Sequence, residues 1–162
     1  NDKSVDYTSV STDDLLKELT LRFKNHYPQK RLSIDLNDVH RLVLLDFSLF
    51  SDAMERLIEI SLEVSEEVKP EVSFDVKGDH LVINLKAPHL RMKEQELEKI
   101  FEPFSTLSEF NQVDALPLRL SLIRTMLNLN KANISAQIDE EDGFVSFEVE
   151  VPLSNEQMKV VR

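Results

Sequence analysis

Only two glycines occur in the chain of 162 residues, and each lies between two stretches in which apolar and polar residues alternate. Gly78 separates "EVSFDV" from "HLVINL", and Gly143 separates "ANISAQI" from "FVSFEVEV". Such alternation is typical of β-strands, and a short connection that contains glycine is typical of a β-hairpin. The sequence therefore predicts two hairpins and assigns both glycines to their turns.

Apolar residues at helical spacing dominate three other stretches. The strongest pattern covers residues 49–68, "LFSDAMERLIEISLEVSEEV", whose glutamates lie largely on other faces than its apolar residues. An earlier helix is predicted from Thr12, as its N-cap, to a point before Pro28. A later helix is marked by four apolar residues, Leu118, Leu122, Met126 and Leu129. Shorter segments are predicted as an extended lead-in before Thr12, a strand in "RLSIDLN", a short apolar segment in "HRLVLLD", and a short helix in "KEQELEKIF".

Composition indicates a single globular domain. Apolar residues make up 41% and charged residues 30% of the chain, so we expect one domain over residues 1–153 and a tail at 154–162. The net charge of -11 disfavours binding of nucleic acid. The chain has no cysteine, which excludes thiol chemistry and agrees with a cytoplasmic location. No long apolar run or signal peptide is found and the chain begins at Asn1, so we expect a soluble piece of a longer protein without direct membrane contact.

The order of these elements resembles a known family. Helix, strand, helix, hairpin, short helix, polar connection, helix and hairpin follow one another as in the ATP-binding domain of sensor histidine kinases and their GHKL relatives among the gyrase and chaperone ATPases. The most specific local match is "LEKIFEPF" (97–104), which is similar to the start of the kinase ATP lid. The resemblance implies a two-layer α/β sandwich, with a mixed sheet of about five strands packed on about three helices.

The resemblance also assigns the nucleotide site, beginning on the long helix. The family pattern there is similar to NLLxNAxKYS, and its second asparagine helps to hold the magnesium ion. Here the same register reads "RLIEISLEVS", with Arg56 and Ile60 at the two asparagines and Glu63 at the lysine. Isoleucine offers no oxygen to a hard cation, and a glutamate repels a triphosphate.

Two glycine motifs of the family are also altered. At DxGxG the chain reads "APHLR", with Ala87 at the adenine-binding aspartate and His89 and Arg91 at the glycines. At GLGL it reads "PLRL", with Pro117 and Arg119 at the glycines. Proline removes a backbone donor and the larger side chains occupy space that glycine leaves open. The expected lid, residues 105–115, contains no glycine.

These substitutions predict a degenerate ATP-binding-like domain with no cofactor, no metal site and no catalytic residues. One alternative is a divergent kinase domain that binds nucleotide through a rebuilt site, and another is an unrelated α/β interaction module. The arginines at positions 91 and 119 can be solvated surface residues or part of a new anion site. The glutamates of the long helix can form a solvated face or meet a basic partner.

The partners follow from the resemblance alone. It implies an upstream helical hairpin in the parent protein, for dimerisation and phosphotransfer, and a response-regulator receiver domain. We expect the docking surface at the mouth of the former pocket and along the lid, and its candidate residues are His89, Arg91, Phe104, Phe110 and Arg119.

Overall fold

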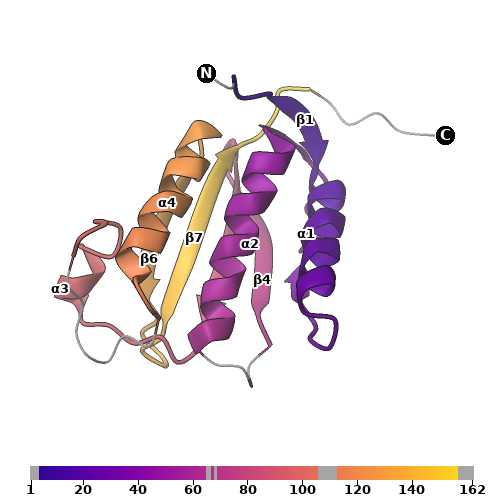
Figure 1. Ribbon diagram of the computed structural model, residues 1–162. Coiled ribbons are helices and arrows are strands. Elements are labelled where there is room, and N and C mark those ends of the chain that lie inside the picture. Colours follow the sequence, from indigo (N-terminus) through magenta and orange to yellow (C-terminus); the bar gives the residue numbers. More distant parts are fainter. Residues whose placement is uncertain (1–3, 65–66, 68, 106–112, 157–162) are drawn as a thin grey trace.

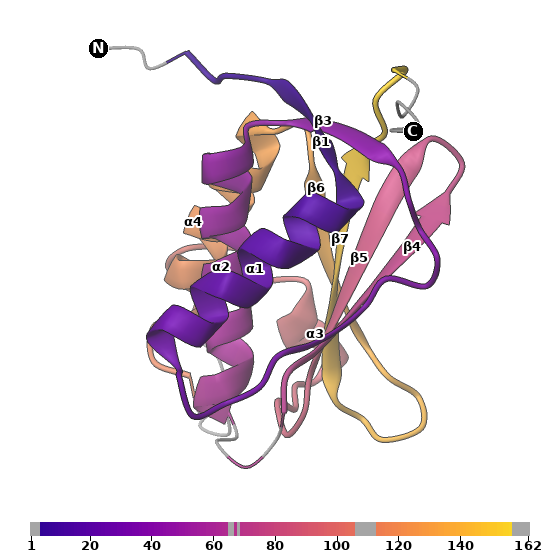
Figure 2. The ribbon, with the colours of Figure 1, turned by 90° about the vertical axis from the view of Figure 1, so that its right-hand side faces the viewer.

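The computed structural model describes residues 4–64, 67, 69–105 and 113–156, and these residues form two layers, with helices covering one face of a sheet (Figure 1). The helices are α1 (Thr12–His26), α2 (Phe47–Val64), α3 (Glu94–Leu97) and α4 (Leu116–Leu129). The strands of the main sheet are β2 (Ser33–Asp35), β4 (Glu71–Lys77), β5 (His80–Ala87), β6 (Asn133–Ile138) and β7 (Val145–Pro152). The view along the layers in Figure 2 shows α1, α2 and α4 on the same side of the strands.

The main sheet is mixed and has the strand order β2-β4-β5-β7-β6. β2 pairs parallel with β4, whereas the other neighbours are antiparallel. Both hairpins are confirmed, because β4 pairs with β5 and β6 with β7 on either side of the two glycines. Gly78 and Gly143 have φ angles of 59° and 76°, the left-handed region in which glycine meets no steric penalty. The fold predicted from the sequence is therefore confirmed.

The N-terminal lead-in belongs to a second, two-stranded sheet. β1 (Thr8–Ser11) pairs antiparallel with β3 (Leu42–Leu45), which the sequence predicted only as an extended lead-in and a separate short apolar segment. The expected cap of α1 was wrong by one residue, since Ser11 is the N-cap and its side chain accepts a hydrogen bond from the Asp14 amide at 3.0 Å. Thr12 is buried instead, and its hydroxyl donates to the Val39 carbonyl at 2.7 Å.

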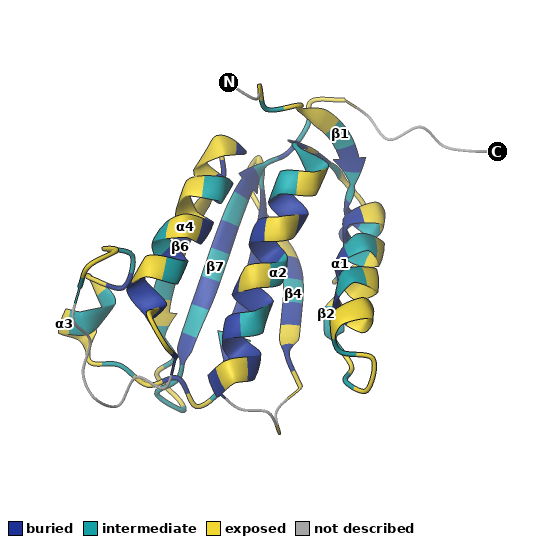
Figure 3. Cartoon of the chain, viewed as in Figure 1, coloured by how far each residue is buried: buried dark blue, intermediate teal, exposed yellow. Residues whose placement is uncertain are grey.

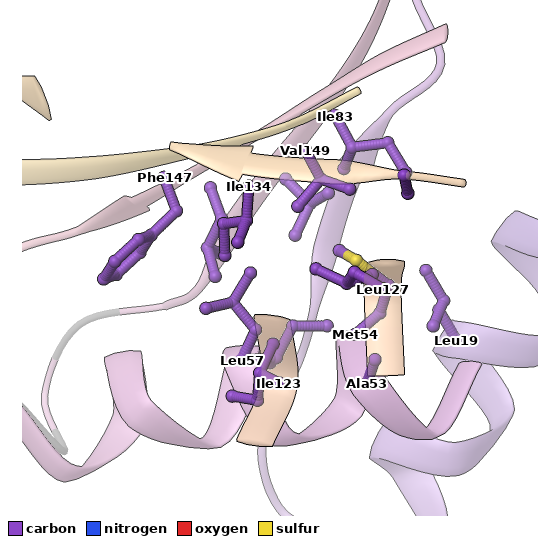
Figure 4. Packing of buried hydrophobic residues seen from close by; sticks show 14 of the residues in the cluster. Leu19, Ala53, Met54, Leu57, Ile83, Ile123, Leu127, Ile134, Phe147 and Val149 are labelled. Atoms are coloured by element: carbon purple, nitrogen blue, oxygen red, sulfur yellow. The ribbon is translucent and has the colours of Figure 1, made fainter. Parts of the chain in front are cut away.

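The core lies between the helical layer and the sheet. Along β7 buried positions alternate with half-buried ones, so that one face of the strand meets the helices. Ten residues of α2 are buried, which makes it the central helix of the layer. In Figure 4 side chains of Leu57 and Ile123 point from the helices toward Phe147 and Ile134 of the sheet. Burial of apolar side chains at this scale is the main source of stability in a domain of this size.

The helix α4 is confirmed, but the four apolar residues that marked it are not its buried face. Leu118, Leu122 and Leu129 are about half exposed, and Met126 is partly buried. The buried residues of α4 are Leu116, Pro117, Leu120, Ile123 and Leu127. Because apolar residues surround most of this helix, periodicity alone does not identify the side that meets the core.

No helix among the described residues is both long enough and apolar enough to cross a membrane. Ser154, the first residue of the expected tail, is held by hydrogen bonds: its amide donates to the Leu42 carbonyl and its hydroxyl lies 3.0 Å from that of Ser9.

Candidate functional site

The positions that the resemblance assigns to nucleotide binding come from three parts of the fold. They lie in the second half of α2, at the end of β5 with the turn after it, and at the beginning of α4. α2 contacts both β5 and α4, so it is the element that connects the other two. The positions fall into an interior group with buried side chains and a rim group with charged or exposed side chains.

The interior group consists of apolar residues that belong to the core. Ile60 on α2 and Ala87 at the end of β5 are both 0% exposed. Leu116 and Leu120 at the start of α4 belong to the same core cluster, and Pro117 is buried as well. An apolar side chain can neither bind a hard cation nor accept a hydrogen bond from an adenine amino group. The interior positions therefore contribute packing rather than polar groups.

At the rim, two of the charged substitutions pair with each other. Nη1 of Arg119 donates a hydrogen bond to the carboxylate of Glu63, which joins the first turn of α4 to the last turn of α2. The side chains of Arg119 and Glu63 are 30% and 45% exposed, so this is a surface ion pair. Its arginine is already neutralised by a partner within the chain, which lowers its attraction for an external anion.

A second rim cluster surrounds Phe144, in the turn between β6 and β7. The His89 ring lies 5.2 Å from the Phe144 ring, and the Arg91 guanidinium lies 4.6 Å from the centroid of the same ring. Nη1 of Arg91 comes within 2.9 Å of where a Cβ on Gly143 would stand. His89 has a φ of 72°, so the position assigned to a glycine keeps a backbone conformation that favours glycine.

The N-terminus of α4 has one backbone donor fewer than an ordinary helix. Its N-cap is Ala115, which has a φ of 52° and makes no side-chain capping bond. Pro117 lacks a backbone N–H, and the Arg119 amide donates to the Ala115 carbonyl at 3.1 Å. The helix end therefore presents fewer N–H groups to a phosphate than a glycine-rich turn does.

The acidic ridge on α2 consists of Glu55, Glu59 and Glu63, which stand at successive i, i+4 positions. Burial, followed by the charge of Glu55, raises the pKa of Glu59 above the ordinary carboxyl value. Burial raises the pKa of the neighbouring Tyr27 as well, and the charges of the same three glutamates add to that shift. The ridge thus places negative potential beside the rim, which disfavours a triphosphate.

The sequence left two interpretations of these glutamates open, a solvated face and contact with a basic partner, and the structure shows contacts with basic residues of the chain itself. Glu55 and Glu59 are half-buried, and Glu55 forms ion pairs with Arg22 and His26 of α1. Arg22 also pairs with Glu18 and Asp52. The spacing of acids along α2 did not identify these basic residues, because they come from a different helix.

The candidate docking residues lie in different surroundings. His89 and Arg91 share the Phe144 cluster, whereas Arg119 is paired with Glu63. Phe104 is 91% exposed and lines a shallow hollow with Lys99, Glu102, Pro103 and Ser105. Phe110 lies outside the described residues. Arg56, at the first asparagine position, is exposed on α2.

The chain is similar to known proteins in its structure. No protein-family model matches the sequence, and no curated protein matches it. Among solved structures, full-length ShkA in complex with AMPPNP superposes with a TM-score of 0.74 at 13% identity, over 95% of this chain and 32% of that one. The catalytic domain of histidine kinase ThkA gives a TM-score of 0.73 at 19% identity, over 91% and 95% of the two chains.

A further ThkA structure, in complex with the response regulator protein TrrA, gives a TM-score of 0.69 at 17% identity, over 93% of this chain and 42% of that one. The chain thus spans 32% of full-length ShkA, 42% of the ThkA chain in the complex with TrrA and 95% of the isolated ThkA catalytic domain. Identities this low establish the fold alone. The chain has the fold of the catalytic, ATP-binding domain of histidine kinases.

Proposed function

We propose that this chain is a non-catalytic, ATP-binding-like domain of a histidine-kinase-type or phosphorelay protein in the cytoplasm, and that it acts as a structural and docking module in two-component phosphotransfer. The observation that carries the proposal is the pair of fully buried apolar residues, Ile60 and Ala87, at the positions assigned to the metal ligand and the adenine acceptor. A buried site without polar groups offers nucleotide neither charge compensation nor hydrogen bonds.

The rim of the site supports the same function. Glu63 and Arg119 satisfy each other, and His89 and Arg91 pack on Phe144, so four substituted side chains are engaged within the chain. A domain that keeps its core but uses these positions for internal contacts acts through its surface. The partners that we propose are a receiver domain, as in the complex of ThkA with TrrA, and an upstream helical hairpin of the parent protein.

Nucleotide titration tests the non-catalytic part of the proposal. We expect no change in Tm with ATP or ADP at up to millimolar concentration, with or without magnesium. A ligand at 100 times its Kd stabilises a protein by about 2.7 kcal/mol, which corresponds to a rise in Tm of roughly 5–10 °C for a domain of this size. ShkA, which was solved with AMPPNP, is the positive control. Saturable stabilisation by nucleotide would support the divergent kinase instead.

Phosphotransfer tests the docking part. The measurement compares the parent protein with variants that lack this domain or that carry Arg91→Glu and Arg119→Glu. We expect the transfer rate to the receiver, the affinity for it or the stability of the dimer to change. If all three quantities are the same in every variant, the domain has no regulatory role and the proposal fails.

A further inference from the structure

The strand β6 forms one edge of the main sheet, and β2 forms the other. Native edges are usually protected by charged side chains, by proline or by their shortness, because an open edge binds further strands. β2 has three residues and contains Asp35, and it is followed by Asn37 and Asp38, whose positive φ angles end the extended conformation. β6 has six residues, "NISAQI", and none of them is charged or a proline. The edge at β6 is therefore the unprotected one.

Alternate residues of β6 direct their backbone groups toward this edge. The Asp139 amide donates to the Phe144 carbonyl at 2.9 Å, so these two residues, between β6 and β7, form a hydrogen-bonded pair of the hairpin. Hydrogen-bonded and non-hydrogen-bonded pairs alternate along an antiparallel ladder. The N–H and C=O groups of Ile134, Ala136 and Ile138 consequently point away from β7. Within the described part of the chain, these groups have no hydrogen-bond partner beyond the edge.

A groove lies between this edge and α3, which contacts β6. It has a volume of about 460 Å³ and is lined by Glu94, Leu97, Glu98, Ala136, Gln137 and Ile138. Leu97 and Ala136 pack against the core, and Ile138 is half-buried, so these three provide its apolar lining. In Figure 3 α3 lies at one end of the row of helices, and its ribbon is exposed or intermediate. A groove between a helix and an open strand edge fits one extended chain, whose backbone pairs with the strand and whose alternate side chains enter the groove.

The charged groups of the groove are two carboxylates. Glu94 and Glu98 are exposed, and the side chain of neither forms an ion pair or a hydrogen bond with a described residue. The nearest lysines along the chain, Lys93 and Lys99, do not line the groove, and Lys99 lines a separate hollow with Glu102. Two uncompensated carboxylates attract a basic residue and repel an acidic one. The charge of the groove therefore selects a basic segment.

A second copy of this chain is a poorer occupant of the edge. Each copy has a net charge of -11, and β6 has no basic side chain that could compensate Glu94 and Glu98 of the other copy. The lysine before β6, Lys131, already lies 5.2 Å from the centroid of the Tyr7 ring. Pairing of two copies through β6 would thus join two acidic surfaces, which repel each other.

We propose that β6 accepts an extended segment of a partner protein as an added strand of the main sheet, with an apolar residue beside Leu97 and a lysine or arginine beside Glu94 and Glu98. The inference rests on the proposed function only in assuming that the domain acts through contact with protein. It places this contact at an edge of the sheet rather than at the former nucleotide site, and it requires no nucleotide.

Two synthetic peptides of nine residues test the proposal with the whole chain. Both have threonine at the odd positions and valine at positions 4 and 6, and positions 2 and 8 are lysine in one peptide and glutamate in the other. Because the pattern is the same from either end, it fits both strand directions. Binding is measured by fluorescence anisotropy at about 0.15 M salt. We expect the lysine peptide to bind, and the glutamate peptide to bind at least about tenfold more weakly.

Methylation of the peptide backbone distinguishes strand addition from other binding. Neighbouring N–H groups of a strand point to opposite edges, so only every second amide of the peptide can face β6. One version of the lysine peptide is N-methylated at its two valines, and another at the threonines of positions 5 and 7. We expect one version to lose binding and the other to keep its affinity within about threefold.

Substitutions in the chain locate the site. Ala136→Pro removes an N–H that points to the open edge and leaves the hydrogen bonds to β7 in place, and we expect it to weaken the lysine peptide by about tenfold or more. Glu98→Lys should weaken the same peptide by about threefold or more. Glu71→Lys, the same change at an exposed glutamate of β4, is the matched control and leaves the affinity unchanged. Circular dichroism melting checks that each variant folds.

The inference fails if the lysine peptide does not bind at millimolar concentration, if the glutamate peptide binds as tightly, or if the two N-methylated peptides behave alike. It also fails if Glu71→Lys weakens binding as much as Glu98→Lys does. Dimerisation of the chain in sedimentation equilibrium that Ala136→Pro abolishes would show that a second copy occupies the edge instead. Nucleotide titration reports on the proposed function separately. A chain that binds ATP and also the lysine peptide refutes the non-catalytic function and leaves this inference standing.

Discussion

The interior and the rim of the candidate nucleotide site differ in how their substituted residues are accommodated. In the interior, Ile60 and Ala87 are fully buried and belong to the hydrophobic core of the domain. At the rim, Glu63 and Arg119 remain partly exposed and form an ion pair. The interior residues thus contribute to the stability of the fold, whereas the rim residues contribute mainly to the charge of the surface.

This difference indicates which positions can be substituted with little loss of folding stability. A buried apolar residue that is replaced by a polar one loses its packing and leaves a polar group without partners. A surface ion pair contributes little net stability, because water solvates both charges when the pair is broken. We therefore expect changes in the interior to affect stability several times more than changes at the rim.

The largest expected effect is that of Ile60→Asn. Its side chain is 0% exposed on α2, so the substitution should lower the free energy of unfolding by about 3–5 kcal/mol. The corresponding decrease in Tm is at least about 6 °C. We do not expect the asparagine to restore binding of ATP, because Pro117 and Arg119 still occupy the glycine positions.

Arg56→Asn is the matched control, since it places the same residue at the first asparagine position of the same helix. Arg56 is exposed, and we expect a change of no more than about 0.5 kcal/mol. Thermal unfolding and nucleotide titration of both variants test the comparison. It fails if Ile60→Asn has the same Tm as the unsubstituted chain, or if it binds ATP.

The sequence predicted the elements that depend on local pattern. Both hairpins follow from strand alternation around Gly78 and Gly143, and α2 follows from apolar residues at helical spacing. The β1–β3 pairing was not predicted, because it joins short segments about 35 residues apart in sequence and short apolar runs do not specify their partner.

Features of the site that depend on two elements were also missed. The Glu63–Arg119 pair joins residues 56 positions apart, and the packing of Arg91 on Phe144 joins β5 and β7 through their turns. The buried face of α4 was not identified because leucines lie both toward the core and toward solvent. The positions of Ile60 and Ala87 were assigned by resemblance, and their burial became visible only in the structure.

A smaller effect is expected at the rim. A double-mutant cycle of Glu63→Gln and Arg119→Gln measures the coupling between the two charges. We expect about 0.2–1 kcal/mol at low salt, as for other exposed pairs, and a lower value at 0.5 M salt because the charges are screened. A coupling of several kcal/mol would show that the rim supports the fold as strongly as the interior does. A second cycle on the ion pair between Lys77 and Glu148, on the sheet, gives a coupling energy for comparison.

The smallest effect is expected for Glu59→Gln, and it depends on pH. Burial, followed by the charge of Glu55, raises the pKa of Glu59 in the folded protein above its value in the unfolded chain. A carboxyl group with a raised pKa favours the folded state when it is protonated, and this contribution is lost as the pH rises from the ordinary carboxyl pKa, about 4.3, through the pKa of the folded state.

At pH 7 glutamine removes an unfavourable charge from the acidic ridge. We therefore expect Glu59→Gln to raise Tm by no more than about a few degrees at pH 7, and the gain to disappear near pH 4. Melting curves from pH 4 to pH 8 test this, with Glu67→Gln, the same substitution at an exposed glutamate beyond α2, measured in parallel for comparison. A gain that is the same at every pH would mean that glutamine improves packing or helix propensity, and that the charge of Glu59 on the acidic ridge does not oppose folding.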